Sequence, residues 1–374
     1  MLKPLTSEQN QWVETTIGNM TLEQQVGQLL CPVIPHFQTD DWLRLLQQVP
    51  LGALFIRSMP GAAIREMLTT IQDSSPVPLL VAGDLEHGAS AVADESTIFP
   101  WPMAAGAADN LDLISEMGRA TAAEARYCGL HWNFGPVVDL NLNFNNPITN
   151  IRSMSDDPDR IVRLSVPLIK SLQAGDHLAA TAKHFPGDGV DDRDHHIAGS
   201  VNSLPMAQWK ETYGRVFQAA IDAGVMSIMP GHISLPDYQG YRQNPDDAPP
   251  ATLSRDLLIK LLREEMGFDG LIVSDASSMN GLTTRVPTAE RAARSIAAGI
   301  DMYLFPDSLQ EFNYLLASLE EGILSAERVR DAARRVLELK ARLHLPEDPF
   351  GPPPSETDKT TFRQAGGGGL SIRA

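Results

Sequence analysis

The segment from Lys183 to His196, KHFPGDGVDDRDHH, gathers side chains that can bind or release protons. Nine of its fourteen residues are titratable, and two glycines and a proline exclude a regular helix. Asp194 and His196 are two residues apart, so their side chains lie on the same side of an extended segment. The carboxylate can then hydrogen-bond the imidazole and fix its tautomer, which suits a group that donates and accepts a proton in successive steps. This pair is the first catalytic candidate.

The other acidic residues of this segment and His195 are expected to be solvated rather than catalytic. His195 would point away from Asp194 and His196, and it is expected to be a solvated loop histidine. The carboxylates of Asp188, Asp191 and Asp192 are expected to solvate the loop.

Short apolar runs alternate with longer amphipathic stretches along almost the whole chain, a pattern typical of parallel strands joined by helices. Eight runs are predicted to be strands, at residues 28–34, 52–56, 78–84, 131–140, 179–185, 226–230, 271–276 and 301–306. Helical patterns lie between and after them, such as those at 41–49, 113–129, 159–175, 253–267, 308–323 and 325–343. Eight such units favour an α/β fold of the closed (β/α)8 TIM-type barrel class. An open doubly wound sheet is the alternative, although no glycine-rich phosphate loop follows an early strand.

The chain is expected to hold one catalytic domain, residues 1–345, without a C-terminal α/β sandwich domain. After this point the composition changes, because EDPFGPPPSETDK has linker composition and GGGGLSIRA offers no packing face. Residues 346–374 are therefore expected to form a disordered tail rich in proline and glycine.

In such a barrel the catalytic groups stand at the carboxyl ends of the strands, and polar side chains there must be hydrated or paired. The candidates are Asp84, Asp139, Lys183, His184, His232 and Asp275, with Arg152 on the loop after the fourth strand. A carboxylate that ends the apolar run LIVSD, as Asp275 does, needs either cationic partners or a function. Asp139 could instead cap a loop, and His232 could be a hydrogen-bonded histidine at the barrel rim.

The bulk properties exclude some classes of partner. A net charge of -17 argues against nucleic acid or an anionic membrane and is compatible with a small neutral ligand. No run of about 18 apolar residues occurs. The N-terminal MLKPLTSEQNQWVETT lacks the apolar core of a signal peptide, so a cytoplasmic location is expected. Cys31 and Cys128 have apolar neighbours and are expected to be buried free thiols.

Taken together, these residues and their order resemble glycoside hydrolase family 3. The similarity covers roughly residues 18–340, through NMTLEQQVGQLL, GDLEHG, NFGPVVDL, NPITNIRSMSDDP, KHFPGDG, GFDGLIVSD and AAGIDMYLFP. Within the family the chain is similar to the bacterial β-N-acetylglucosaminidases, which carry an Asp-x-His acid/base pair after KHFPG.

This resemblance implies a retaining, exo-acting β-glycosidase that releases terminal β-linked N-acetylglucosamine through an aspartyl glycosyl-enzyme. Asp275 would be the nucleophile, with Asp194 and His196 as the acid/base pair. The substrate-binding residues would be Asp84, Arg152, Lys183, His184, His232 and Asp139. A small saccharide is the expected partner, and neither a metal nor an organic cofactor is expected.

Two departures from the family pattern affect the choice of sugar. DLEHG stands where many hexosaminidases have DQEGG, and Asp188 replaces the second histidine of KHFPGHG. A β-glucosidase of the same family is therefore an open alternative. So is a phosphorylase, because a histidine acid/base repels incoming phosphate less than a carboxylate does.

Two further alternatives come from other classes of protein. A metal-dependent hydrolase could bind zinc through His184, His195, His196 and His232, but no H-x-H ends the first strand and no HExxH helix is present. A non-catalytic sugar-binding barrel would require Asp275 or the Asp194–His196 pair to be misplaced.

Overall fold

The computed structural model describes residues 2–33 and 39–367. Eight strands within these residues fall inside the eight predicted runs. They are β1 (Leu30–Cys31), β2 (Ala53–Phe55), β3 (Leu80–Gly83), β4 (Trp132–Asn133), β5 (Thr181–Phe185), β7 (Ser227–Pro230), β9 (Leu271–Ala276) and β10 (Met302–Leu304). Two short strands, β6 (Ser200–Val201) and β8 (Ile233–Ser234), pair with each other beside them.

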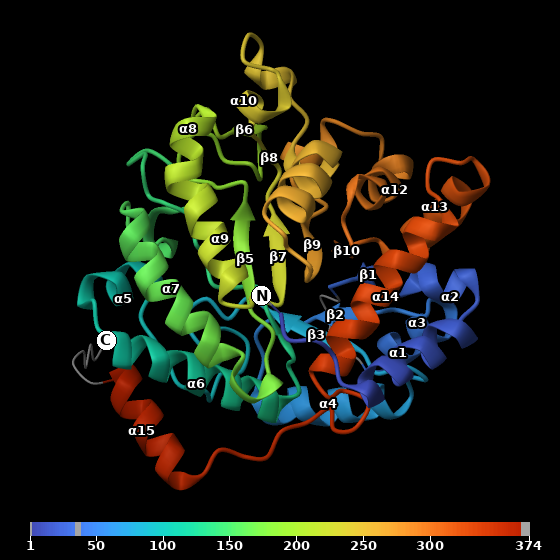
Figure 1. The fold of residues 1–374 in the computed structure, drawn as a ribbon. Coiled ribbons are helices and arrows are strands. Elements are labelled where there is room, and N and C mark those ends of the chain that lie inside the picture. The colour runs from blue at the N-terminus through green and yellow to red at the C-terminus, as the bar shows by residue number, and fades with distance from the viewer. Residues whose placement is uncertain (1, 34–38, 368–374) are drawn as a thin grey trace.

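The strands pair in parallel and lie at the centre of the molecule, with helices around them (Figure 1). One sheet has the order β1-β10-β9-β7-β5, and the other has the order β2-β3-β4. A bridge between Val33 and Phe55 links the β1 segment to β2, and a bridge between Trp132 and Ala179 links β4 to the residues before β5. The predicted α/β class with parallel strands is confirmed.

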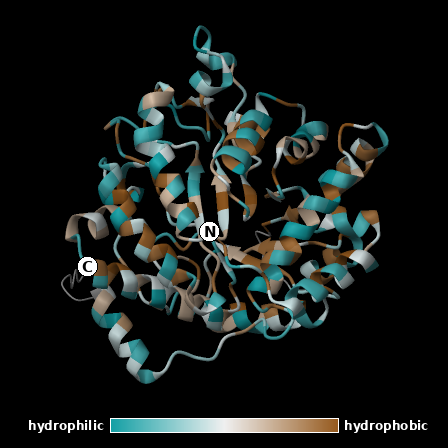
Figure 2. Ribbon diagram, in the orientation of Figure 1, coloured by the Kyte–Doolittle hydropathy of each residue, from teal (hydrophilic) through white to brown (hydrophobic). Residues whose placement is uncertain are grey.

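Helices surround the strands, and most of them turn an apolar side inward (Figure 2). They are α1 (Ser7–Asn19), α2 (Leu22–Gly27), α3 (Thr39–Gln48), α4 (Gly61–Asp73), α5 (Pro102–Ala108), α6 (Leu111–Cys128), α7 (Pro158–Leu172), α8 (Met206–Trp209), α9 (Arg215–Asp222), α10 (Pro236–Gln239), α11 (Asn280–Thr283), α12 (Thr288–Ala298), α13 (Ser308–Glu320), α14 (Ala326–Arg342) and α15 (Glu356–Gly367). The N-terminus of α7 follows its sequence signals: Pro158 is the first helical residue, and the Asp157 side chain accepts a hydrogen bond from the Asp159 amide.

Strand β9 shows how the core positions the site. Leu271, Ile272 and Val273 are buried, as expected for a parallel strand covered on both faces. Burying one such side chain contributes about 1.5–3 kcal/mol, so the strand is firmly held. Ser274 then accepts a hydrogen bond from the Leu304 amide, and Asp275 follows at the carboxyl end.

The C-terminal segment differs from the expected disordered tail. Helix α15 packs against α6, and Phe362 is buried against Phe99, Met117 and Ala120. The expectation of disorder is therefore wrong for residues 356–367, where one aromatic anchor and several helix-forming residues outweigh the linker-like sequence before them. The GGGGLSIRA end lies mostly outside the described residues.

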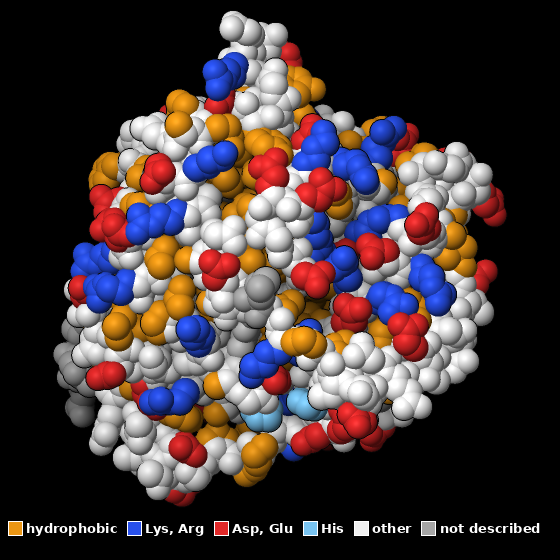
Figure 3. Space-filling view, viewed as in Figure 1, with side chains coloured by type: hydrophobic (Ala, Val, Ile, Leu, Met, Phe, Trp, Pro, Cys, Tyr) orange, Lys and Arg blue, Asp and Glu red, His pale blue; other side chains and the backbone are white. Residues whose placement is uncertain are grey.

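Other bulk properties can be read from the structure. Cys31 and Cys128 are buried free thiols, as predicted. No helix in the described part of the chain combines the length and hydropathy needed to cross a bilayer. Acidic and basic side chains are interspersed on the face shown in Figure 3, without a large patch of one sign.

Candidate active site

The carboxyl ends of the strands and the loops after them enclose a cavity of about 140 Å³. Its polar lining comes from residues far apart in the sequence, namely Asp84, Arg152, Lys183, His184, His195, His196 and Asp275. Its apolar lining includes Phe134, Met229 and Phe305. A larger hollow of about 910 Å³ lies between α1, α2, α3 and the segment before β3. Among the described residues that line this hollow, Glu23 is the one charged residue. The smaller cavity is the candidate site because charged groups converge on it.

Asp275 stands at the tip of β9 with a mostly buried carboxylate. Its Oδ1 accepts a hydrogen bond of 2.8 Å from the Ala276 amide, and its Oδ2 lies 3.9 Å from His195 Nδ1. Burial alone would raise the pKa of Asp275, but His195, His184, His232 and the Ala276 amide outweigh burial and hold the pKa below its ordinary value. The carboxylate is therefore ionised at neutral pH, as a nucleophile must be.

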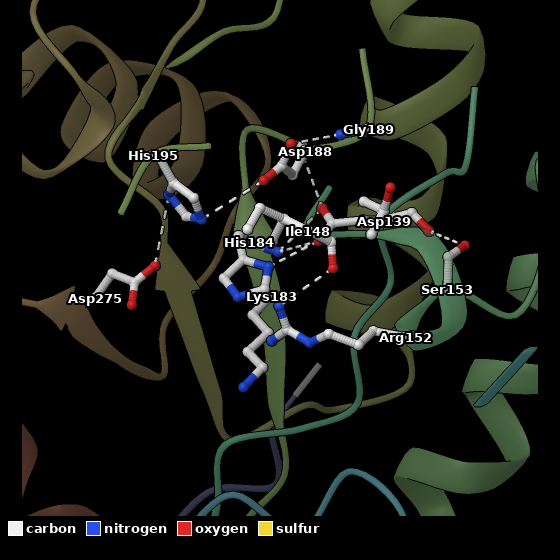
Figure 4. Close-up of polar contacts among 12 residues, drawn as sticks. Asp139, Ile148, Arg152, Ser153, Lys183, His184, Asp188, Gly189, His195 and Asp275 are labelled. Atoms are coloured by element: carbon white, nitrogen blue, oxygen red, sulfur yellow. Dashed lines mark hydrogen bonds and ion pairs between the residues drawn. The ribbon is translucent and has the colours of Figure 1, made fainter. Parts of the chain in front are cut away.

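His184 is held by Asp139, which lies behind it. Asp139 Oδ2 is 2.7 Å from His184 Nδ1, and the same carboxylate accepts hydrogen bonds from the amides of His184 and Asp188 (Figure 4). Asp139 is fully buried and does not line the cavity, so it orients His184 rather than facing the ligand space. Burial raises the pKa of Asp139, and these donors bring it below the ordinary value.

Asp84, Arg152 and Lys183 form a charged wall of the cavity, and Glu86 lies behind this wall. Glu86 receives two hydrogen bonds from Arg152, at 2.9 and 2.7 Å, and lies 2.7 Å from Lys183 Nζ. Lys183 also donates to Asp84 at 3.0 Å, and the Asp84 side chain is half-exposed. Burial raises the pKa of Glu86, but Lys183 and Arg152 outweigh burial, and the pKa falls well below the usual range. Two cations and two anions thus form one group, in which Lys183 and Glu86 are buried and Asp84 is half-exposed.

The predicted Asp194–His196 pair is formed. His196 Nδ1 lies 2.6 Å from Asp194 Oδ1, and the same oxygen accepts the His196 amide at 2.8 Å. The His196 side chain is 52% exposed and lines the cavity that Asp275 also lines. Backbone hydrogen bonds fasten this loop to α11, because Asn280 N donates to His196 O and Gly281 N donates to His195 O. The loop is thus attached to the segment that follows the Asp275 strand.

His195 corrects the prediction of a solvated loop histidine. It is fully buried and lies between Asp275 and Asp188, 3.9 Å from one carboxylate and 3.5 Å from the other (Figure 4). Burial lowers the pKa of His195 to about 3, so its ring is neutral. The prediction failed because the loop turns back over β5 and β9 instead of extending into water.

Asp188 is also misassigned as a solvating residue. It is buried, and its Oδ1 accepts hydrogen bonds from Asn146 Nδ2 at 2.8 Å and from the Gly189 amide at 2.6 Å. Burial, reinforced by the Asp139 carboxylate, raises the pKa of Asp188 to about 6. Asp191 is partly buried and binds Arg193 and the Val201 amide, so its role is also structural.

This arrangement can be compared with known proteins. The model of the family described as "Glycosyl hydrolase family 3 N terminal domain" matches residues 21–339. The chain belongs to glycoside hydrolase family 3. The resemblance inferred from the sequence is confirmed.

Several family members are similar over most of this chain. A beta-N-acetylglucosaminidase/beta-glucosidase of Cellulomonas fimi is 40% identical over 89% of this chain and 60% of that protein. A beta-hexosaminidase of Methylobacillus flagellatus is 30% identical over 82% of this chain and 87% of that protein. Among solved structures, the beta-glucoside phosphorylase BglX gives a TM-score of 0.89 at 34% identity, covering 96% of this chain and 66% of that one. The chain thus spans less than two thirds of the Cellulomonas protein.

Within this family 3 site, the sequence predictions separate into two groups. Asp84, Arg152, Lys183, His184, His196 and Asp275 all line the cavity. His232 does not line it: its ring is buried, with Nε2 2.9 Å from the Ala276 carbonyl and Nδ1 2.8 Å from Thr252 Oγ1, so it supports the residue after Asp275.

Sequence reasoning assigned no role to Glu86, which binds both cations of the cavity wall. A signal was present, because Glu86 lies two residues after Asp84 and its side chain lies on the same side of an extended segment.

The zinc alternative requires several histidine or carboxylate side chains to surround one metal ion. Among the residues described, no cluster of three or more histidine, cysteine, aspartate or glutamate side chains is arranged to hold a metal ion.

Proposed function

We propose that this chain is the catalytic domain of a retaining, exo-acting β-glycosidase that releases terminal β-linked N-acetylglucosamine. The observation that carries the proposal is that Asp275 and His196 line one small cavity, with His196 bound to Asp194. The parallel strand order and the two bridges between the sheets favour a closed (β/α)8 barrel as its architecture. In that fold, the shared edge of the strands is where catalytic groups are expected.

The mechanism is a double displacement. The Asp275 carboxylate attacks the anomeric carbon while protonated His196 donates its proton to the departing glycosidic oxygen. Neutral His196 then takes a proton from water, which attacks the anomeric carbon and releases Asp275. Burial raises the pKa of Asp194, but the His196 amide and ring outweigh it and keep the carboxylate ionised. Asp194 can therefore stabilise the imidazolium and fix its orientation.

The charged wall supplies recognition of a neutral sugar. The Asp84 carboxylate can accept hydrogen bonds from hydroxyl groups, Lys183 and Arg152 can donate to them, and His184 offers its second ring nitrogen, Nε2. Because Glu86 neutralises the cations without reaching into the cavity lining, Lys183 and Arg152 keep their positions while retaining donors for a ligand.

Two variants of this function have specific support. The Cellulomonas relative carries both the glucosaminidase and the glucosidase name, so glucose is the alternative sugar. BglX is named a beta-glucoside phosphorylase, so phosphate is the alternative acceptor. In that case phosphate oxygen, rather than water, would attack the glycosyl-enzyme and yield a sugar 1-phosphate.

One set of assays tests the proposal and its variants. Nitrophenyl β-N-acetylglucosaminide and nitrophenyl β-glucoside are compared at equal concentration, each with and without inorganic phosphate. We expect higher kcat/KM on the N-acetylglucosaminide, with free sugar as product. Preference for the glucoside, or sugar 1-phosphate as product, would select the corresponding variant. No turnover of either glycoside would refute the glycosidase assignment.

A further inference from the structure

Four buried polar atoms lie along one line through the candidate site without a hydrogen-bond partner among the described residues. They are Asp188 Oδ2, both ring nitrogens of His195, and Asp275 Oδ2. Nε2 of His195 is 3.5 Å from the Asp188 oxygen, and Nδ1 is 3.9 Å from the Asp275 oxygen (Figure 4). Buried polar groups are normally paired, and small movements would pair these atoms with one another.

The pairing depends on the tautomer of His195, because a neutral imidazole carries one N–H. If Asp188 is protonated, it donates to Nε2, and the ring N–H is then on Nδ1, facing Asp275. If Asp188 is ionised, it accepts from Nε2–H, and Nδ1 presents a lone pair to the Asp275 carboxylate. The hydrogen bond at one ring nitrogen thus sets what the other nitrogen offers.

We propose that His195 and Asp188 are positioning residues for Asp275, and that the proton on Asp188 selects the His195 tautomer that donates to the nucleophile. This inference rests on the proposed role of Asp275 in glycoside cleavage. With Nδ1–H donating to Oδ2 and the Ala276 amide donating to Oδ1, both carboxylate oxygens are fixed. Loss of the Asp188 proton replaces one of these attractions by repulsion.

The groups around Asp188 make it the residue of this line that titrates near neutrality. It faces the Asp139 carboxylate, the His184 and His195 rings and the Tyr213 hydroxyl, which bonds to its carbonyl. Burial and Asp139 raise the pKa of Asp188 to about 6, whereas burial lowers the pKa of His195 to about 3 and raises that of Tyr213 well above its usual value. The proton therefore leaves Asp188 while His195 stays neutral.

The test measures the first chemical step with a leaving group that needs no proton from His196. Enzyme in excess is mixed with the 2,4-dinitrophenyl β-glycosides of glucose and of N-acetylglucosamine, and dinitrophenolate release is followed from pH 5 to pH 8. Here the Asp275 oxygen bonds to the anomeric carbon and dinitrophenolate departs with the electron pair, so no proton from His196 is required. For the wild type, we expect the single-turnover rate to fall about tenfold or more above pH 6, the effect of losing one hydrogen bond to a charged group.

The Asp188→Asn variant should lose this fall, because its amide donates to Nε2 at every pH. His195→Leu should also lose it, with a rate at pH 5 at least about tenfold below the wild type, since the donor to Asp275 is gone. Asp192→Asn, an exposed aspartate on the same loop, is the matched control and should keep the wild-type profile.

A flat wild-type profile would overturn the inference, as would a fall that persists in Asp188→Asn or in His195→Leu. Its failure can be told apart from failure of the proposed function. Dinitrophenolate release by the wild type with identical pH profiles in the variants refutes only the positioning role. Absence of release from both glycosides refutes the glycosidase function and this inference with it.

Discussion

Glu86→Gln should weaken both the fold and the site, although Glu86 need not touch the ligand. The carboxylate binds Arg152 twice and Lys183 once, and the side chains of Glu86 and Lys183 are 7% and 3% exposed. Glutamine has nearly the same shape as glutamate, but it carries no negative charge, and its amide NH₂ group would face Lys183 or Arg152. Breaking a buried ion pair from one side costs about 3–5 kcal/mol, because the remaining charge stays buried without compensation.

The expected result is a free energy of unfolding lower by about that amount, measured by urea denaturation. Since Lys183 and Arg152 line the cavity, their displacement should also lower kcat/KM on a nitrophenyl glycoside by about 10², the effect of misplacing binding groups by an ångström. Glu66→Gln, on the exposed face of α4, is the matched control and should change neither quantity measurably. If Glu86→Gln were as stable and active as this control, the account of the charged wall would be wrong.

Three further outcomes are expected. Asp275→Ala should abolish turnover of aryl and natural glycosides alike, and activity near the wild-type level in a steady-state assay would remove Asp275 from the mechanism. His196→Ala should lower kcat by about 10²–10⁴ on substrates with poor leaving groups and much less on a dinitrophenyl glycoside; equal losses on both would contradict an acid/base role. Lys340 is fully buried on α14, donates to Gln28 at 2.6 Å, and has its pKa lowered by burial to about 7. Between that pH and its unfolded pKa the unfolded chain holds a proton that the folded chain lacks, so stability rises with pH there. Relative to Lys340→Met, the wild type should gain about 1.4 kcal/mol of unfolding free energy per unit from pH 7.5 to 9.5, and a difference independent of pH in urea denaturation would refute the assignment.

Much of the architecture follows from local patterns. Strand β9, which carries Asp275, coincides with the predicted run 271–276, and α7 covers most of the predicted helix 159–175. Residues at the ends of parallel strands must come to one edge, which is why Asp84, Lys183, His184 and Asp275 could be grouped before their contacts were known. The Asp194–His196 contact is equally local, because two residues of spacing suffice to form it.

The sequence alone determined the alternation of strands and helices and most of the strand-end side chains at the cavity edge, because periodicity and short spacing are properties of neighbouring residues. Tertiary structure decided which loop side chains turn inward. His195 is buried because the amides of α11, more than eighty residues later in the chain, fasten its loop over β9. Glu86 acquires its role only when β5 and the loop after β4 bring Lys183 and Arg152 to it. Burial and charge pairing between distant segments depend on packing of the whole chain, so no local pattern specifies them.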